Sequence, residues 1–196
     1  MKKIGIFGGT FDPIHFGHLN LALSILEKHK LEEIWWIPVK INPLKLKHPT
    51  ADFHRLAMLK LALEHLPFFK ILELELRHND TSYTIETIKI LRAQFPSYRF
   101  YLLLGDDALL HFMNWKSPLE IIQLAPPLIG SRKYEKCPDL SLPHELQKIF
   151  QRGWTRIPLL EISSTELRKR VKNNLYCEHL APAKTLDYIR EYQLYS

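Results

Sequence analysis

Apolar residues fall along the chain in short continuous runs, separated by longer amphipathic stretches. Strands are predicted where these runs occur, at 3–7, 33–39, 68–74, 99–105, 127–131 and 157–162. Most of the runs are apolar throughout and do not alternate with polar residues, which is the pattern of strands buried on both faces. They indicate a parallel sheet with both faces covered.

The amphipathic stretches predict the helices that cover the sheet. Apolar residues recur at helical spacing at 18–29, 52–66, 84–95 and 181–195. Asp52 and Thr84 are expected to cap two of these helices, and Ser117 to cap another that has Pro118 in its first turn. Strands that alternate with helices predict an α/β fold, with a parallel sheet and helices on both of its faces.

Length and cysteine usage restrict the class of protein. The 196 residues fit one domain, expected to span 1–196, and contain neither a repeat nor an interdomain linker. Two cysteines, Cys137 and Cys177, are too few for a disulfide framework or a paired zinc motif. No signal peptide or membrane-spanning run is present. We therefore expect a cytoplasmic protein with no membrane partner.

The formal net charge of +6 arises from basic and acidic residues that are interspersed, which suits an anionic substrate. The densest basic run, RKRVK at 168–172, is typical of a solvated helix face. Aromatic residues do not interleave with this run, so we expect no nucleic acid partner.

Polar and conformationally special residues gather directly after the predicted strands. They occupy 8–18, 40–47, 77–84, 105–115, 132 and 163–168. Ligands of open parallel α/β sheets bind outside the carboxyl ends of the strands. These segments are therefore predicted to line one crevice.

The loop after the first predicted strand is rich in turn-forming residues. It reads GGTFDPIHFGH from Gly8 to His18. The Gly8-Gly9 pair lets the backbone approach a ligand closely, because no Cβ intervenes. Pro13 fixes the path of the turn, and Asp12 is expected to hydrogen-bond to the backbone of its own loop.

Two histidines close this loop. We expect a helix to start near Gly17 or His18, so that the imidazoles of His15 and His18 converge on its N-terminus. Free N–H groups and the helix dipole attract anions there, and the loop is predicted to hold phosphate. Its spacing fits neither a P-loop nor a dinucleotide-binding fingerprint. A zinc site would need a third and a fourth ligand, and the remaining histidines lack that spacing.

The motifs resemble those of a known superfamily. GGTFDPIHFGH at 8–18 resembles the H-x-G-H signature of the nucleotidylyltransferases, and ISSTELR at 162–168 resembles their second signature. SYTIET at 82–87, GDDALLHFMNW at 105–115 and the C-terminal LAPAKTLDYIREYQLY resemble the bacterial nicotinate mononucleotide adenylyltransferases. The likeness covers essentially the whole chain. It implies a Rossmann-like doubly wound sheet and a reaction that joins nicotinate mononucleotide to ATP, giving deamido-NAD and pyrophosphate.

The same resemblance implies roles for individual residues. The catalytic candidates are His15, His18 and Arg168. The candidates for ATP binding are Gly8, Gly9, Thr10, Phe11, His15, His18, Gly105, Asp107, Arg132, Ile162, Ser163, Ser164, Thr165 and Arg168. The candidates for mononucleotide binding are Lys45, Tyr83, Thr84 and Trp115. Most of these residues match a position of a family motif, whereas Arg132 is named because it follows a predicted strand.

Several of these residues also have a purely structural interpretation. Core packing alone would explain residues as large as Phe11 and Trp115. Asp107 is suited to cap a helix, and Arg132 to lie exposed. Ser163 stands three residues before a glutamate, which is the spacing of a capping box and a sufficient reason for a serine.

Magnesium is the implied cofactor, held mainly by the ATP phosphates and water, with no side-chain metal site expected. Two positions depart from the family pattern: Leu44 stands where histidine is common, and Lys116 stands where an aromatic residue often follows Trp115. These departures leave open a preference for nicotinamide mononucleotide, or for both substrates. A non-catalytic nucleotide-binding protein is the remote alternative. The sequence is compatible with a homo-oligomer.

Overall fold

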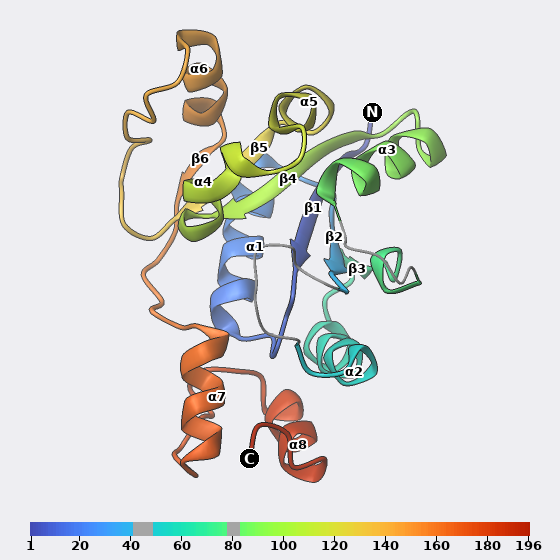
Figure 1. Ribbon diagram of the computed structural model, residues 1–196, viewed down its shortest axis with the longest axis vertical. Helices are drawn as coiled ribbons and strands as arrows, with labels where there is room; N and C mark the ends of the chain where they lie inside the picture. The colour runs from blue at the N-terminus through green and yellow to red at the C-terminus, as the bar shows by residue number, and fades with distance from the viewer. Residues whose placement is uncertain (41–48, 78–82) are drawn as a thin grey trace.

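The computed structural model of the protein describes residues 1–40, 49–77 and 83–196, so Leu44 and the predicted contact Lys45 lie outside the described residues. Within the described part the strands form one parallel sheet in the order β3-β2-β1-β4-β5-β6 (Figure 1). The strands are β1 (Lys3–Gly9), β2 (Glu33–Pro38), β3 (Phe69–Ile71), β4 (Arg99–Gly105), β5 (Pro127–Ser131) and β6 (Trp154–Arg156).

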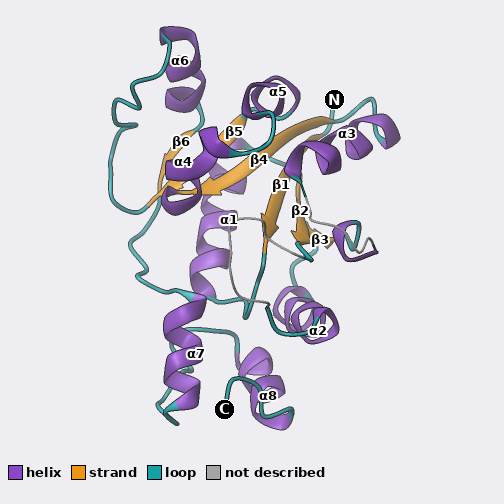
Figure 2. Ribbon diagram, viewed as in Figure 1, coloured by secondary structure: helices purple, strands orange, loops and turns teal. Residues whose placement is uncertain are grey.

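Helices connect the strands and cover both faces of the sheet, as Figure 2 shows. They are α1 (Phe16–His29), α2 (Asp52–Leu63), α3 (Thr84–Gln94), α4 (Asp106–His111), α5 (Pro118–Leu124), α6 (His144–Arg152), α7 (Ser164–Lys172) and α8 (Ala183–Glu191). Two 3₁₀ turns, η1 (Glu75–Arg77) and η2 (Phe112–Asn114), follow β3 and α4. The predicted doubly wound α/β fold is confirmed.

Side chains alternate between two cores along each strand, as the pleat of a strand requires. In β1, Ile4 and Ile6 enter a core shared with α3, α5 and α6, whereas Phe7 enters the core shared with α1, α2, α7 and α8. All three are buried, which explains why the strand reads as continuously apolar.

The centre of the sheet is a switch in strand order. β1 pairs in parallel with β2 on one side and with β4 on the other. In an open parallel sheet, such a switch is the place where ligands bind, outside the carboxyl ends of the strands. In Figure 1, β1 points toward the end of the molecule that holds α7, α8 and the C-terminus.

The strand predicted at 157–162 is wrong. The edge strand β6 (Trp154–Arg156) lies upstream of it, and a segment without regular structure runs from residue 157 to α7. Ile157 still donates its N–H to the Ser131 carbonyl at 2.9 Å, but Pro158 has no N–H with which to continue the ladder. The apolar character of the stretch reflects Ile157 and Ile162, two residues of this segment whose side chains are buried.

Two predicted caps also lie one residue away from the observed ones. Ala51 caps α2, and Asp52 in its first turn pairs with Arg55 instead. Tyr83 caps α3, so Thr84 is the first helical residue. Ser117 occupies the N-cap position of α5 as predicted, with a left-handed backbone (φ 54°), but its side chain makes no capping hydrogen bond.

No helix in the described ranges is both long and apolar enough to cross a bilayer.

Gly153 allows β5 and the end of α6 to come into contact, and we expect a side chain there to destabilise the fold. An added Cβ would collide with the carbonyl oxygen of Pro127 and lie 3.4 Å from the Leu128 Cα, and both are backbone atoms that cannot rotate away. Gly153→Ala should therefore lower the free energy of unfolding by about 1–3 kcal/mol, the usual cost of overpacking. Urea denaturation measures this. Gly8→Ala is the matched control, because a methyl group there meets no atom within 4 Å. Equal losses in both variants would contradict the argument.

Candidate active site

The start of α1 is closed by two imidazoles. His15 is the N-cap, and its Nδ1 accepts the backbone N–H of His18 at 3.3 Å. In return the Nδ1 of His18 accepts the backbone N–H of His15 at 3.3 Å. The rings stack, with centroids 3.7 Å apart. This is a capping box made of histidines in place of the usual serine and glutamate.

The box fixes which nitrogen of each neutral ring carries the proton. Because Nδ1 accepts a backbone N–H in both rings, the proton of the neutral form lies on Nε2, across the ring from the helix backbone. Each ring is then a hydrogen-bond donor on the side that the helix does not use. Helix α1 begins at Phe16, one residue before the earliest predicted start at Gly17. The imidazoles of His15 and His18 converge at its N-terminus, as expected.

Burial keeps His15 uncharged at neutral pH. Its side chain is 5% exposed. Desolvation, assisted by the positive charge of Arg132 and opposed by Asp107, lowers the pKa of His15 to about 4. The ring is therefore a neutral donor.

The start of α7 docks onto the loop that follows β1. Ser163 is the N-cap and accepts the backbone N–H of Glu166 at 3.1 Å, which is one half of the predicted capping box. Ser164 donates its hydroxyl to the Pro13 carbonyl at 2.9 Å. A Cβ at Gly17 would lie 3.3 Å from the Ile162 carbonyl oxygen, so the two backbones nearly touch. The two signature segments, distant in the sequence, thus meet at the start of α1.

Arg168 extends from α7 over the same loop. Its Nη1 donates to the Asp12 carbonyl at 2.6 Å, and its Nη2 donates to the Thr165 hydroxyl at 3.3 Å. The predicted hydrogen bonds from Asp12 to its own loop are not those observed. Its carboxylate accepts from Thr50 and Tyr195, which belong to other segments.

The glycines and Phe11 shape the beginning of the loop. Phe11 is 2% exposed, has a left-handed backbone (φ 47°) and places its ring 5.2 Å from that of His18. A Cβ at Gly9 would collide with the Phe11 ring, whereas Gly8 faces open space. The side chain of Phe11 therefore has the packing role that its size suggests, and the turn around it positions Thr10.

A second arginine lies where β4 and β5 end. Arg132 is half-buried, not exposed, and its backbone N–H donates to the Asp106 carboxylate at 2.8 Å. Its guanidinium reaches the Leu160 carbonyl at 3.5 Å. Asp107 is the second residue of α4, whose N-cap is Gly105. Sequence reasoning gave Asp106 no role, yet this side chain joins the ends of the two strands.

The remaining candidates form a group beside the start of α3. Trp115 is partly exposed and packs on Phe112, with ring centroids 5.4 Å apart, and its buried indole N–H has no hydrogen-bond partner among the described residues. Lys116 donates to Glu86 at 3.0 Å and places its ammonium 4.5 Å from the centroid of the Tyr83 ring. Lys116 thus joins the segment of Trp115 to the helix that begins at Thr84.

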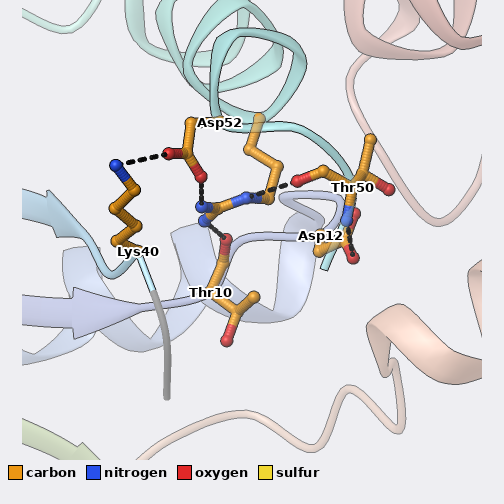
Figure 3. A network of polar contacts seen from close by, with 6 residues as sticks. Thr10, Asp12, Lys40, Thr50 and Asp52 are labelled. Carbon is orange, nitrogen blue, oxygen red and sulfur yellow. Dashed lines mark hydrogen bonds and ion pairs between the residues drawn. The ribbon is translucent and has the colours of Figure 1, made fainter. Parts of the chain in front are cut away.

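Sequence reasoning also missed the structural role of Arg55. Arg55 is fully buried and donates to the Thr50 carbonyl at 2.9 Å, the Thr10 carbonyl at 2.6 Å and the Asp52 carboxylate at 2.5 Å. Figure 3 shows this network, with Lys40 approaching Asp52 to 4.0 Å. An arginine on the apolar stripe of a helix was the available signal, because such a side chain must be paired when buried.

Comparisons with known proteins give a consistent result. A model of the cytidylyltransferase-like family matches residues 6–170. The nicotinate-nucleotide adenylyltransferase of Bacillus subtilis is 36% identical, over 100% of this chain and 99% of the relative. A probable nicotinate-nucleotide adenylyltransferase of Dictyoglomus thermophilum is 39% identical, over 98% of this chain and 99% of the relative.

A solved structure has the same fold. The chain is similar to Plasmodium falciparum nicotinic acid mononucleotide adenylyltransferase complexed with NaAD, with a TM-score of 0.80 and 24% identity over 100% of this chain and 98% of that one. The match to the family model and the full-length relatives together decide the classification. The chain belongs to the cytidylyltransferase-like family, and within it to the nicotinate-nucleotide adenylyltransferases.

Proposed function

We propose that this protein transfers the adenylyl group of ATP to nicotinate mononucleotide, giving deamido-NAD and pyrophosphate in NAD biosynthesis. The observation that carries the proposal is the meeting of the His15–His18 box with the start of α7 and Arg168. Relatives 35–39% identical over nearly the whole chain are named for this activity. The proposed partners are ATP and the mononucleotide, with no nucleic acid, and the proposal is compatible with a homo-oligomer.

The chemistry needs no nucleophile from the protein. A phosphate oxygen of the mononucleotide attacks the α-phosphorus of ATP, and the bond from that phosphorus to the β-phosphate bridge breaks, releasing pyrophosphate. Negative charge develops on phosphate oxygens, so catalysis consists of positioning and charge stabilisation. Three groups are proposed to supply donors: the Nε2–H groups of His15 and His18, and the guanidinium of Arg168.

The neutral imidazole of His15 suits this task. A donor fixed by a backbone hydrogen bond needs no reorganisation when charge develops, which makes it more effective than a mobile one. His15 keeps its proton on Nε2 and, with a pKa of about 4, serves as a donor and not as an acid. Arg132 supplies a full positive charge nearby, which also contributes to that low pKa.

Magnesium would be held by the phosphates of ATP. No cluster of three or more potential metal ligands exists within the described ranges. The carboxylate of Asp12 is already occupied by Thr50 and Tyr195, and that of Asp106 by Arg132. The donors at this end of the sheet are N–H groups and cations, which would hold the ATP phosphates and leave Mg²⁺ to phosphate oxygens and water. Bound in this way, Mg²⁺ would neutralise phosphate charge.

We infer that the mononucleotide lies beside Trp115 and the start of α3. An indole face suits a flat pyridine ring. Backbone N–H groups at the start of α3, near Tyr83 and Thr84, favour a carboxylate over an amide, because a carboxylate only accepts hydrogen bonds. The ammonium of Lys116 is paired with Glu86, which offsets its attraction for a substrate carboxylate. The proposed compartment is the cytoplasm, where the free thiols of Cys137 and Cys177 remain reduced.

Substrate choice tests the proposed function. The purified protein is incubated with ATP, Mg²⁺ and each mononucleotide in turn, and the products are separated. An amide facing a backbone donor leaves an unmet buried group worth about 1–3 kcal/mol, so kcat/KM should favour nicotinate mononucleotide by roughly 5- to 150-fold. Trp115→Ala should weaken both substrates similarly, because stacking scarcely distinguishes acid from amide. Equal wild-type values would reject acid specificity, and no turnover with either substrate would reject the function.

His18→Ala is expected to lower kcat by about 10²–10³, the usual effect of losing one preorganised donor. The variant also loses one half of the capping box, worth about 0.5–2 kcal/mol of stability. Turnover is therefore measured well below the unfolding midpoint, with circular dichroism to confirm folding. Near-normal turnover in the folded variant would remove His18 from the mechanism.

Acid should destabilise the protein through His15. The unfolded ring takes up a proton as the pH falls below about 6.5, whereas the folded ring, with a pKa of about 4, does not. Protonation thus favours unfolding, and this residue should cost about 2 kcal/mol of stability between pH 7.5 and pH 5. Urea unfolding of wild type and His15→Asn at both pH values isolates the effect. His144→Asn is the control, since that side chain is 76% exposed. An unchanged pH dependence in His15→Asn would contradict this assignment.

A further inference from the structure

Asp12 is the point where three distant segments meet. Its Oδ2 accepts the backbone N–H of Thr50 at 3.1 Å, and its Oδ1 accepts the Tyr195 hydroxyl at 2.6 Å. Its main-chain oxygen accepts the guanidinium of Arg168 at 2.6 Å. The residue is 7% exposed. Each of its oxygens is therefore bonded to a different part of the chain.

The contact with Thr50 is held firmly from the other side. Arg55 donates to the carbonyl of Thr50 and to the carbonyl of Thr10, two residues before Asp12 (Figure 3). Asp52 balances the buried guanidinium of Arg55. The loop that follows β1 is thus fixed to the segment that leads into α2, which leaves Tyr195 as the partner that completes the Asp12 carboxylate.

The backbone around Tyr195 is in an uncommon conformation where its hydroxyl contacts the Asp12 carboxylate. Gln193 (φ 48°) and Tyr195 (φ 68°) both lie in the left-handed region, as does Phe11 beside Asp12 (φ 47°). Such conformations cost free energy in residues other than glycine and persist where the surroundings impose them. Burial and the Asp12 carboxylate raise the pKa of Tyr195, so its hydroxyl remains a donor at neutral pH.

Asp12 bears directly on a catalytic candidate. Two hydrogen bonds orient the guanidinium of Arg168, and the shorter one is to the Asp12 carbonyl. The position of that carbonyl depends on how the Asp12 side chain is anchored. Without the Tyr195 hydroxyl, one buried carboxylate oxygen of Asp12 loses its hydrogen bond. The Asp12 side chain would then be favoured to rotate toward solvent, because an unsatisfied buried oxygen costs free energy.

We propose that Tyr195 is a positioning residue for adenylyl transfer, which anchors Asp12 so that the Asp12 carbonyl holds Arg168 against the loop leading to His15. The inference rests on the proposed function and adds a residue outside both signature segments. Tyr195 contributes no charge to the reaction; it acts through Asp12 on the direction of the Arg168 guanidinium.

A double-mutant cycle tests this route. Tyr195→Phe removes only the hydroxyl, and kcat should fall about threefold to tenfold, the range of one hydrogen bond, with the KM of the mononucleotide unchanged. Arg168→Lys keeps the charge but lacks the planar fork. If Tyr195 acts through Arg168, Tyr195→Phe should change kcat less than twofold in the Arg168→Lys background. An equal loss in both backgrounds would overturn the proposal.

Tyr192→Phe is the matched control. Tyr192 lies three residues earlier, is 49% exposed and packs near His54 and Tyr188, so the loss of its hydroxyl should leave kcat unchanged. Thermal unfolding of each variant is measured in parallel. A lower midpoint in Tyr195→Phe with undiminished kcat at 25 °C would show a purely structural role and overturn the proposal.

The test separates this inference from the proposed function. Absence of turnover in the wild-type protein would reject the proposed function alone. In that case, the affinity of the wild type, the two single variants and the double variant for ATP is measured by titration calorimetry. Non-additive losses of affinity would support the link from Tyr195 to Arg168, and additive losses would reject it.

Discussion

The parallel pairing of β1 with strands on both sides is the constraint on which the rest of this structure depends. A parallel neighbour on each side places the carboxyl ends of β1, β2 and β4 at the same edge of the sheet. Successive connections must then return over the faces as helices, which buries both sides of the central strands. The loop that carries His15 and the start of α4, which carries Asp107, therefore lie at the same edge of the sheet.

Polar contacts, together with the buried side chains of Phe11 and Ile14, hold the loop after β1 in position. Irregular backbone near a ligand site cannot satisfy itself as a helix or a strand does, so each buried group needs a specific partner. Here Arg55 supplies donors to two carbonyl groups, and the histidine box supplies acceptors to two N–H groups. The box leaves Nε2 of each ring free of the helix backbone, and an N–H donor at that atom suits a polyanion.

Much of this arrangement could be predicted from the sequence, and the failures have physical causes. The central strands and α3 were evident because local burial pattern and structure agree there. The edge strand was misplaced because Ile157 and Ile162 are buried although they lie in a segment without regular structure, and an apolar pattern cannot distinguish such a segment from a strand. Asp106, Arg55 and Tyr195 were missed for another reason: each acts through a partner 26 or more residues away in sequence, or through a backbone atom. Such contacts produce no periodic pattern of apolar and polar residues in the sequence around them.

The bond between Arg168 and a main-chain oxygen has an evolutionary consequence. A carbonyl group is present whichever side chain stands at position 12, so no substitution there can delete this acceptor. Substitutions at position 12 would change the angle and the strength of this hydrogen bond by degrees, but they would not remove its acceptor. Selection for activity can therefore act on residues far from the two signature segments. Side chains that orient this backbone carbonyl are subject to it, as are those that would contact the substrate.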